Sequence, residues 1–465
     1  MSVLRKLMGY LPEVKGPAQK KLSFKEKLKW TLIILVAFFV LSIIPLYGLS
    51  VNNLENFEQL SIILGASFGS ILSLGIGPIV TSSIVLQLLT GSGLLNIDLS
   101  TPDGKSFFQG LQKILAIFFI IFEAIVYVMM GGLSPEAGLH NYGTLQFLLI
   151  FQLFLGGLMV LFMDEVVSKW GFGSGVSLFI AAGVSSQIFV RAFSPLTQAG
   201  SIAWGTGLAP VGQVWVFISS VLGQDLQTAS LAFFAIFFTV AVFAISVYAQ
   251  AMKVEIPLSF GRVRGYGMRW PLRFIYTSNI PVILVAALLA NVQLWARLLE
   301  NWGHPLLGTF SGSVPISGFV MWVYPPNLVS VIVNNQFTFS IILRASVYAL
   351  FMMAGATLFS VFWVQTAGMD AKSQAKQIMS SGLQIPGFRR DERVLERILK
   401  RYIGPLTIMG ALAVGFLAAL ADLTGALANG TGILLTVMIV YKLYEEVAQQ
   451  HMMDMHPALR KMMEK

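Results

Sequence analysis

Side chains that could do chemistry are few in this chain of 465 residues. The sequence contains no cysteine, so disulfides, thiol nucleophiles and cysteine metal sites are excluded. Its four histidines stand singly, without the spacing of zinc ligands: His140, His304, His451 and His456. The glycine-rich run from Gly171 to Gly175 lacks the lysine and the preceding strand of a phosphate-binding loop, and instead favours close packing where a helix begins. We therefore expect no cofactor, no metal site and no enzyme activity.

Two ionisable side chains, Glu123 and Arg344, lie within long apolar stretches of the sequence. A charge inside a membrane is costly, so such a residue is a candidate for function. Glu123 also has a plainer interpretation as a protonated carboxyl group bonded to a neighbouring helix. Arg344 is expected to reach toward the outer interface. Ion-coupled transporters carry more of these charges, often in pairs, so the pattern disfavours a secondary transporter of a small solute.

The composition indicates an all-α integral membrane protein. Hydrophobic residues make up 56% of the chain and charged residues 11%, and the mean hydropathy is +0.75. A soluble domain carries roughly 25% charged residues. Ten apolar stretches are about long enough to cross a bilayer as helices. They cover residues 30–49, 71–89, 112–131, 145–163, 174–190, 229–250, 274–293, 337–363, 402–421 and 428–443.

The basic residues indicate how these ten transmembrane helices are oriented. With the N-terminus in the cytoplasm, 28 of the 31 Lys and Arg residues fall in cytoplasmic segments, as the positive-inside rule requires. The other three are Arg191, Arg297 and Arg344. If one span were missing, every loop after it would be assigned to the opposite side of the membrane, and the basic residues would no longer sort to one side. We therefore expect ten spans with both termini in the cytoplasm.

Three basic segments stand out on the cytoplasmic side. Residues 1–29 carry apolar side chains at helical spacing beside Arg5 and Lys6, which favours a short amphipathic helix on the membrane surface: Val3, Leu4, Leu7, Met8 and Leu11. A solvated basic tail is the alternative interpretation. The connections 252–273 and 369–401 are long as well as basic. They suit a docking surface for anionic lipid headgroups or for a polyanion such as RNA.

Five spans precede a long connection and five follow it. The chain then divides into an N-terminal half (30–192), an external hinge connection (193–228), a C-terminal half (229–446) and a cytoplasmic tail (447–465). An odd number of spans in each half means that the halves, if related, have opposite orientations, which is a recurring design among transport proteins. No residue-level repeat between the halves is visible, so this symmetry rests on the span count.

The second apolar stretch and the segment before it are interrupted. Residues 56–73 are only moderately apolar and too short to span the membrane, and Gly75, Gly77 and Pro78 follow. Irregular backbone at membrane depth is tolerated only where protein buries it or a cavity surrounds it. A short re-entrant helix inside a pore is therefore expected here.

Several long motifs resemble the SecY family, the channel-forming (alpha) subunits of the Sec protein translocon, and in particular its archaeal members. The resemblance runs from about Val14 to Glu446. Its main motifs are Gly75-Ile-Gly-Pro-Ile-Val-Thr-Ser, Gly171-Phe-Gly-Ser-Gly-Val-Ser-Leu, Tyr276-Thr-Ser-Asn-Ile-Pro-Val-Ile and Gly430-Thr-Gly-Ile-Leu-Leu. It implies ten transmembrane helices in two pseudo-symmetric inverted halves of five, with a short re-entrant plug helix.

The resemblance also implies a ring of apolar side chains that closes the pore. The matching positions are Ile76, Val80, Val176, Ile180, Ile283 and Leu435. Positions four residues apart share one face of a helix, one turn apart. Branched aliphatic side chains can close around a passing polypeptide without bonding to it, and a narrow apolar constriction resists wetting. Ordinary packing between helices is the alternative interpretation of these residues.

A plug and a lateral gate are implied by the same resemblance. The plug is a small helix near residues 57–70 on the external side of the ring, and its residues are Phe57, Leu60, Ile63, Leu64, Gly65 and Phe68. The gate lies between the second and seventh helices, and its polar positions are Thr81, Gln87, Glu123 and Asn291. Hydrogen bonds of roughly 1 kcal/mol each would hold the gate shut, yet yield to an inserted apolar helix.

The basic connections resemble those that dock the ribosome, with the basic positions at Arg262, Arg264, Arg389 and Arg390. The implied partners are a SecE-type (gamma) and a beta-type small membrane subunit in a heterotrimer, the ribosome, a nascent polypeptide with a signal sequence, and membrane lipid. The implied function is to translocate secretory polypeptides across the cell membrane and to release transmembrane segments laterally into it, as a passive gated channel driven by a partner. A secondary transporter of a small solute and an insertase without a pore are the alternatives.

Overall fold

A computed structural model describes most of the chain. The described residues are 11–18, 22–52, 66–95, 97, 101–135, 141–197, 201–203, 208–260, 267–277, 280–312, 314–380, 383–384 and 391–455. Several predicted features lie outside them. These are most of the amphipathic N-terminal helix, the plug positions Phe57, Leu60, Ile63, Leu64 and Gly65, and the arginines Arg262, Arg264, Arg389 and Arg390.

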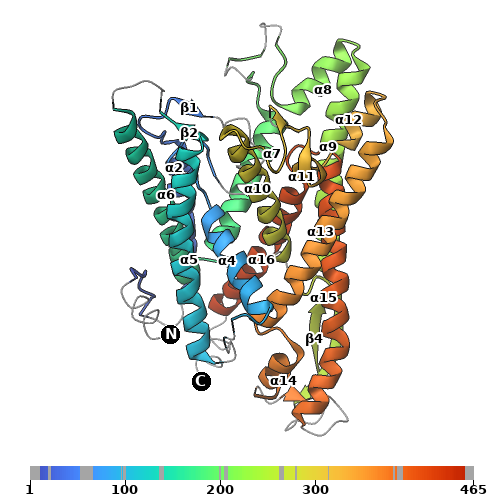
Figure 1. The fold of residues 1–465 in the computed structure, drawn as a ribbon. Helices are drawn as coiled ribbons and strands as arrows, with labels where there is room; N and C mark the ends of the chain where they lie inside the picture. The colour runs from blue at the N-terminus through green and yellow to red at the C-terminus, as the bar shows by residue number, and fades with distance from the viewer. Residues whose placement is uncertain are drawn as a thin grey trace.

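The described part of the chain is mostly helical (Figure 1). Its first elements are α2 (Phe24–Ile43), β1 (Val51–Asn52), α4 (Gly77–Gly91), α5 (Pro102–Met129), β2 (Leu133–Ser134), α6 (Tyr142–Trp170), α7 (Gly175–Phe193) and α8 (Gln213–Leu222). Then follow α9 (Leu226–Ala251), β3 (Lys253–Phe260), β4 (Gly267–Arg273), α10 (Ile280–Asn301), β5 (Phe310–Ser311), β6 (Val314–Pro315), α11 (Gly318–Trp322) and α12 (Leu328–Val333). The last are α13 (Phe339–Thr366), α14 (Ala371–Ser380), β7 (Leu383–Gln384), α15 (Glu392–Leu423) and α16 (Gly430–Met455).

Seven of the described helices are long and apolar enough to cross a membrane: α5, α6, α7, α9, α10, α13 and α15. The other three apolar stretches of the sequence form α2, α4 and α16. Helix α4 has only 15 residues because turns occupy the segment before it, where Gly75 has a positive φ of 54°. Helices α2 and α16 carry charged residues inside their bounds, such as Lys27 and Lys442.

Polar caps decide where several spans begin. The Thr101 side chain accepts the backbone N–H of Gly104 (3.1 Å) at the start of α5, and the Asp391 carboxylate accepts that of Arg393 (2.9 Å) at the start of α15. A cap satisfies helix-end N–H groups that have no partner within the helix. Both helices therefore begin about three turns before the apolar stretch that predicted them, within the polar connections.

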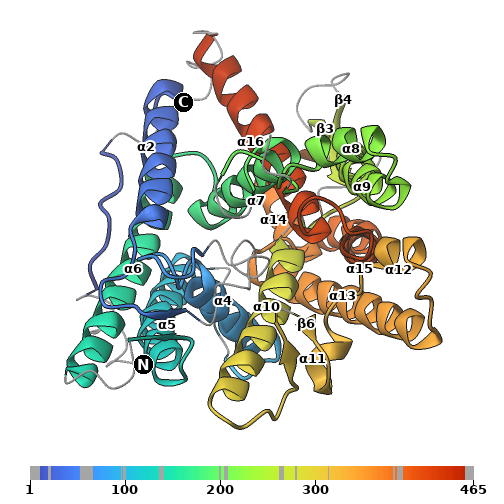
Figure 2. The same ribbon diagram turned by 90° about the horizontal axis from the view of Figure 1, so that it is seen from above.

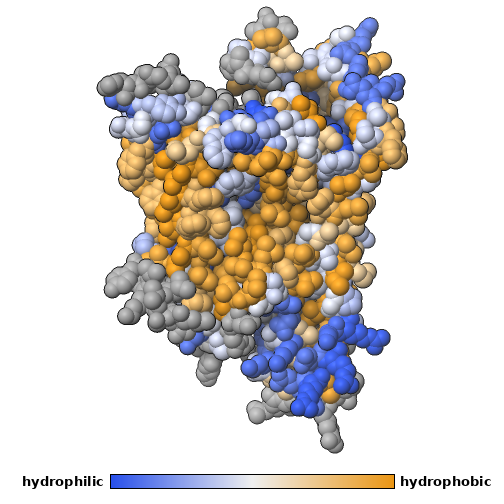
Figure 3. All heavy atoms as spheres, in the orientation of Figure 1, coloured by the Kyte–Doolittle hydropathy of each residue, from blue (hydrophilic) through white to orange (hydrophobic). Residues whose placement is uncertain are grey.

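The outer surface of the helical bundle is apolar. Figure 3 shows a broad hydrophobic belt around the middle of the molecule and hydrophilic surface at its ends. Large apolar side chains are exposed on the long apolar helices, among them Val240 of α9 (61%), Leu350 of α13 (64%) and Phe151 of α6 (47%). A surface of this kind suits contact with lipid and not with water.

The two long basic connections are joined by one small β-sheet. Strands β3 and β4 form an antiparallel hairpin from the pair Lys253–Arg273 to the pair Ser259–Gly267. Strand β7, from the second connection, pairs with β3 through Ser259 and Gln384. The sheet packs with α14 and α15 over an apolar cluster of Ile256, Leu272, Val364, Ala375, Ile378, Leu395, Leu399 and Ile403. The two connections therefore form a single folded unit at the hydrophilic lower end of Figure 3.

Both described ends of the chain lie at the same end of the molecule as this unit (Figure 1). The Gln450 side chain of α16 donates to the carbonyl of Leu22, just before α2 (2.7 Å). Arg273 of β4 forms an ion pair with Glu445 of α16. The start of α2, the end of α16 and the sheet are thus at one end of the molecule, and α8, α11 and α12 are at the other (Figure 1).

Seen from above, the helices surround a centre where the two halves meet (Figure 2). Helices α2, α4, α5 and α6 gather on one side, and α9, α10, α13 and α15 on the other. Helix α4 contacts α5, α10 and α13, and α7 packs beside α16. The contacts between halves therefore run along α4 with α10 and α13 and along α7 with α16.

Candidate functional site

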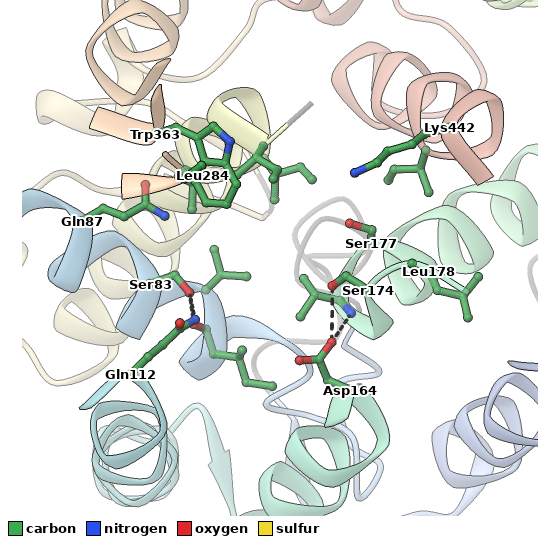
Figure 4. A pocket seen from close by; sticks show the side chains of 18 of the residues that line it. Ser83, Gln87, Gln112, Asp164, Ser174, Ser177, Leu178, Leu284, Trp363 and Lys442 are labelled. Atoms are coloured by element: carbon green, nitrogen blue, oxygen red, sulfur yellow. Dashed lines mark hydrogen bonds between the residues drawn. The ribbon is translucent and has the colours of Figure 1, made fainter. Parts of the chain in front are cut away.

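A cavity of about 530 Å³ lies between the halves, at the end of the bundle that carries the β3–β4–β7 sheet. Helices α4, α5, α6, α7, α10, α13 and α16 all contribute to its wall. Its polar lining includes Ser83 and Gln112, whose side chains are hydrogen-bonded (2.6 Å), and Lys442 from α16 faces it across the centre (Figure 4). A water-accessible space thus enters the bundle from this end.

Three of the six predicted ring positions line this cavity, and the other three are buried in the apolar cluster at the centre of the bundle. Val80, Val176 and Ile283 line it. The remaining three are almost fully buried in the central apolar cluster: Ile76 (1% exposed), Ile180 (2%) and Leu435 (2%). The cavity therefore borders aliphatic side chains contributed by α4, α7 and α10, and α16 adds Leu435 within the same cluster.

Three of the four predicted polar gate positions meet in one hydrogen-bonded cluster. Asn291 of α10 donates its Nδ2–H to the hydroxyl of Thr81 on α4 (2.9 Å). That hydroxyl lies 2.8 Å from the Gly77 carbonyl and 3.4 Å from Oε1 of Glu123 on α5. Because Thr81 has one hydrogen to donate, the shorter contact with the carbonyl is the stronger. The Glu123 carboxyl group thus faces a neighbouring helix.

Gln87 is not part of this cluster. It is buried on α4 and lines the cavity near Trp363 (Figure 4). Within the described residues its Oε1 has no hydrogen-bond partner. A buried polar atom without a partner is a costly exception in a folded protein, so this oxygen is a candidate for a functional role.

Two contacts between the halves were not anticipated from the sequence. The ring of Phe122 on α5 stacks on Trp295 of α10 with centroids 5.6 Å apart. Gly91, at the end of α4, lies against Phe362 of α13, so close that a Cβ atom there would be 2.4 Å from the ring. The sequence holds a weak signal for the first contact, because Phe122 precedes Glu123 and Trp295 follows Asn291 by one turn.

The described end of the predicted plug is fixed at the opposite side of the ring. The backbone N–H of Leu46 donates to the Gly69 carbonyl (2.9 Å), and Asn52 donates its side-chain N–H to the Phe68 carbonyl (3.2 Å). The Phe68 side chain packs against an apolar cluster that includes Phe310 of β5 and Val320 of α11. This segment therefore connects the end of α2 to the C-terminal half.

The approach to α10 is tied to two other helices. Tyr276 donates its hydroxyl hydrogen to the Met369 carbonyl after α13 (2.7 Å). The hydroxyl groups of Thr277 and Ser360 are 2.9 Å apart, and Ser360 donates to the Thr407 carbonyl of α15 (3.3 Å). The approach to α10 is therefore bonded both to the end of α13 and, through Ser360, to α15.

Tyr276 provides a pH-dependent test of this anchor. Burial, with a smaller contribution from the charge of Asp370, raises the pKa of Tyr276 to about 12, against about 10 in an unfolded chain. Its contribution to stability is therefore complete below pH ~10 and is lost as the pH rises through about 12. The difference in tyrosinate absorbance between the wild type and Tyr276→Phe should titrate near pH 12. A difference that titrates near pH ~10 would show that the hydroxyl is not held as described.

Comparison with known proteins decides the family. A sequence model of the SecY family matches residues 70–444, and one of the plug domain of Sec61p matches residues 36–69. The chain is 48% identical over 464 residues to the protein translocase subunit SecY of Methanothermobacter thermautotrophicus, with 98% of this chain and 97% of that protein covered. The chain belongs to the SecY family.

Other members of the SecY family are similar over their whole length. The SecY subunit of Methanocaldococcus jannaschii is 41% identical, with 100% of both chains covered. A solved structure described as a protein-conducting channel has a TM-score of 0.82 at 41% identity, covering 98% of this chain and 99% of that one. Sec61 in a canine ribosome–channel complex has a TM-score of 0.79 at 40% identity, with the same coverage. The expected resemblance to the archaeal type is confirmed.

Proposed function

We propose that this SecY-family chain is the central subunit of a protein-conducting channel. It translocates secretory polypeptides across the membrane and releases transmembrane segments laterally into the lipid. The observation that carries this function is the cavity between the halves, which borders aliphatic side chains that include Val80, Val176 and Ile283. A narrow apolar constriction excludes water and ions but can yield to an extended chain.

Ten helices span the membrane in this proposal. They are α2, α4, α5, α6 and α7 in the half 30–192, and α9, α10, α13, α15 and α16 in the half 229–446. The connection 193–228, with α8, is external, and the segments 1–29 and 447–465 are in the cytoplasm. The positive-inside distribution supports this orientation in the cell membrane. The common location of the α2 start, the α16 end and the basic sheet agrees with it.

The ring of Ile76, Val80, Val176, Ile180, Ile283 and Leu435 closes the pore, and residues 57–70 form the plug on its external side. The match of residues 36–69 to the Sec61p plug domain supports the plug. The lateral gate opens between two pairs of helices, α4 and α5 from one half and α10 and α13 from the other. Its polar contacts are those of Thr81, Glu123 and Asn291, while Gln87 meets the chain from the cavity.

The partners follow from the basic unit and from the relatives. Sec61 has been seen in a ribosome–channel complex, and the sheet that joins the two basic connections gives this chain one docking surface for ribosomal RNA. Arg262, Arg264, Arg389 and Arg390 would bond its phosphates, since arginine binds phosphate bidentately. A SecE-type and a beta-type small subunit complete the heterotrimer, and the ribosome or another partner drives the nascent chain through it.

A reconstitution experiment tests the channel function. Vesicles that contain the heterotrimer should protect a secretory precursor from added protease. A precursor whose signal sequence carries two charges in its apolar stretch should stay accessible. Equal protection of both precursors, or protection of neither, would contradict the proposal, because a channel opened by an apolar signal must distinguish them.

The ribosome contact makes a separate prediction. Ribosomes should co-sediment with the reconstituted protein at low salt concentration. The affinity should fall steeply as the salt concentration rises, because contacts with phosphates release counterions. The double substitution of Arg262→Ala and Arg264→Ala should lower the slope of log affinity against log salt by about one per arginine. Lys25→Ala with Lys29→Ala removes the same charge from the exposed start of α2 and is the control. An equal effect of both pairs would indicate general charge attraction only.

A further inference from the structure

Two aspartates in different halves of the chain make the same contact with the helix that follows them. Asp164 lies near the end of α6, and its Oδ1 accepts the backbone N–H of Val176 (3.0 Å) and the hydroxyl of Ser174 (3.4 Å). Asp422 lies in the last turn of α15, and its Oδ1 accepts the backbone N–H of Thr431 (2.7 Å). Val176 and Thr431 are each the second residue of their helix, α7 and α16.

A glycine at the first position of each helix permits this contact. A Cβ atom on Gly175 would lie 2.6 Å from the Cα of Asp164. A Cβ atom on Gly430 would lie 2.0 Å from the backbone carbonyl carbon of Ala421, next to Asp422. Because backbone atoms cannot give way as a flexible side chain can, any other residue would push the helix away. Both helices thus begin pressed against the end of the preceding helix.

The aspartates suit this position electrostatically. A carboxylate at a helix N-terminus accepts N–H groups that have no partner inside the helix and interacts favourably with the helix dipole. Charge-assisted hydrogen bonds are also shorter and stronger than neutral ones. Asp422 is held in turn from α13, because the Tyr348 hydroxyl donates to its Oδ2 (2.6 Å) and the Thr431 hydroxyl donates to the same oxygen.

Both contacts are adjacent to the proposed pore ring, because Val176 is itself a ring position and the other two ring positions on these helices follow the contacts by one turn. Ile180 follows Val176 by four residues, and Leu435 follows Thr431 by four residues, so each pair shares a helical face. The two helices also pack together, since a Cβ atom on Gly432 of α16 would be only 3.1 Å from Val184 of α7. A shift at the start of either helix is therefore transmitted directly to a ring side chain.

We propose that Asp164 and Asp422 are paired positioning residues of the channel. Each one sets the axial position and the rotation of one ring-bearing helix, α7 from the cavity end and α16 from the opposite end. The inference rests on the proposed role of Ile180 and Leu435 in closing the pore. It also supplies a residue-level correspondence between the halves. In each half an aspartate lies near the end of one helix, and the next helix begins with a glycine. The aspartate accepts the backbone N–H of the second residue of that next helix.

The absence of native cysteine allows a crossed test. Two variants, Ile180→Cys and Leu435→Cys, each carry a single cysteine. In reconstituted vesicles, a membrane-impermeant thiol reagent is added from the cavity side, and the rate at which it modifies each cysteine is measured. Asp164→Ala should raise the modification rate of the first cysteine by about tenfold and leave that of the second within about twofold. Asp422→Ala should do the reverse. A purely structural role would loosen both helices together.

The conservative variants and the controls make the test specific. Asp164→Asn and Asp422→Asn keep an Oδ1 acceptor and should restore modification rates close to those of the wild type. Glu165→Ala removes the neighbouring carboxylate, which bonds the Val14 N–H (3.0 Å) and Lys113 and not α7, and should change neither rate. Equal changes at both cysteines, or no change at either, would overturn the pairing. The channel function would be contradicted separately if serine at Ile180 caused no ion leak.

Discussion

Serine at the ring positions is expected to make the resting channel leak ions. The variant replaces four side chains that are nearly buried in the central cluster: Ile76, Val80, Ile180 and Ile283. Each lost CH₂ group lowers the free-energy cost of wetting the constriction by roughly 0.8 kcal/mol. A barrier that falls by roughly 1.4 kcal/mol lets ions pass about ten times faster. The conductance of reconstituted vesicles without a substrate should therefore rise by well over an order of magnitude.

Two lipid-facing substitutions are the controls for this leak. Leu288→Ser on α10 and Val190→Ser on α7 remove aliphatic side chains from the same helices as Ile283 and Ile180, but at positions that are 39% and 47% exposed. They should leave the conductance at background. A leak from the controls as large as that of the ring variant, or a ring variant that stays closed, would mean that these residues only pack the bundle.

Opening of the lateral gate is expected to become easier when two of its contacts are removed together. Phe122→Ala eliminates the stack on Trp295 (5.6 Å), and Asn291→Ala eliminates the hydrogen bond to Thr81 (2.9 Å). An aromatic pair contributes about 0.5–1.5 kcal/mol, and an intramembrane hydrogen bond averages about 0.6 kcal/mol. The ratio of open to closed gates should rise by roughly six- to thirtyfold.

A precursor with a weakened signal sequence measures this change, since its apolar segment supplies less free energy to open the gate. The double variant should translocate such a precursor markedly better than the wild type does. Phe118→Ala is the matched control, because Phe118 is a neighbouring aromatic residue of α5 whose ring meets Phe119 edge-on and stacks on Phe122 of its own helix. No gain over this control would show that the two contacts do not hold the gate.

Much of the site could be anticipated because SecY-type motifs place its residues on known helices. Thr81, Glu123 and Asn291 lie in one hydrogen-bonded cluster. Gln87 differs, because it lies two turns further along α4 and faces the cavity instead. The aromatic contact of Phe122 with Trp295 was not anticipated, since apolar and aromatic residues occur throughout both spans and the proximity of the two residues to Glu123 and Asn291 is only a weak signal.

The sequence by itself determined the class of this protein and the location of its apolar stretches, and it predicts their orientation. Hydropathy and basic charge act locally, on each segment in contact with lipid or water, so they can be read along the chain without knowing what packs on what. The same local information located the interruption before α4, where Gly75 adopts a positive φ.

Only the tertiary structure decided what depends on distant partners. The two basic connections form one unit because β7 pairs with β3, across more than 120 residues of sequence. Asp164 and Asp422 were not singled out from the sequence, because an aspartate near a helix end is ordinary until the next helix is seen to begin against it. Both features arise from hydrogen bonds made after the helices pack, and a sequence records the donors and acceptors but not which of them meet.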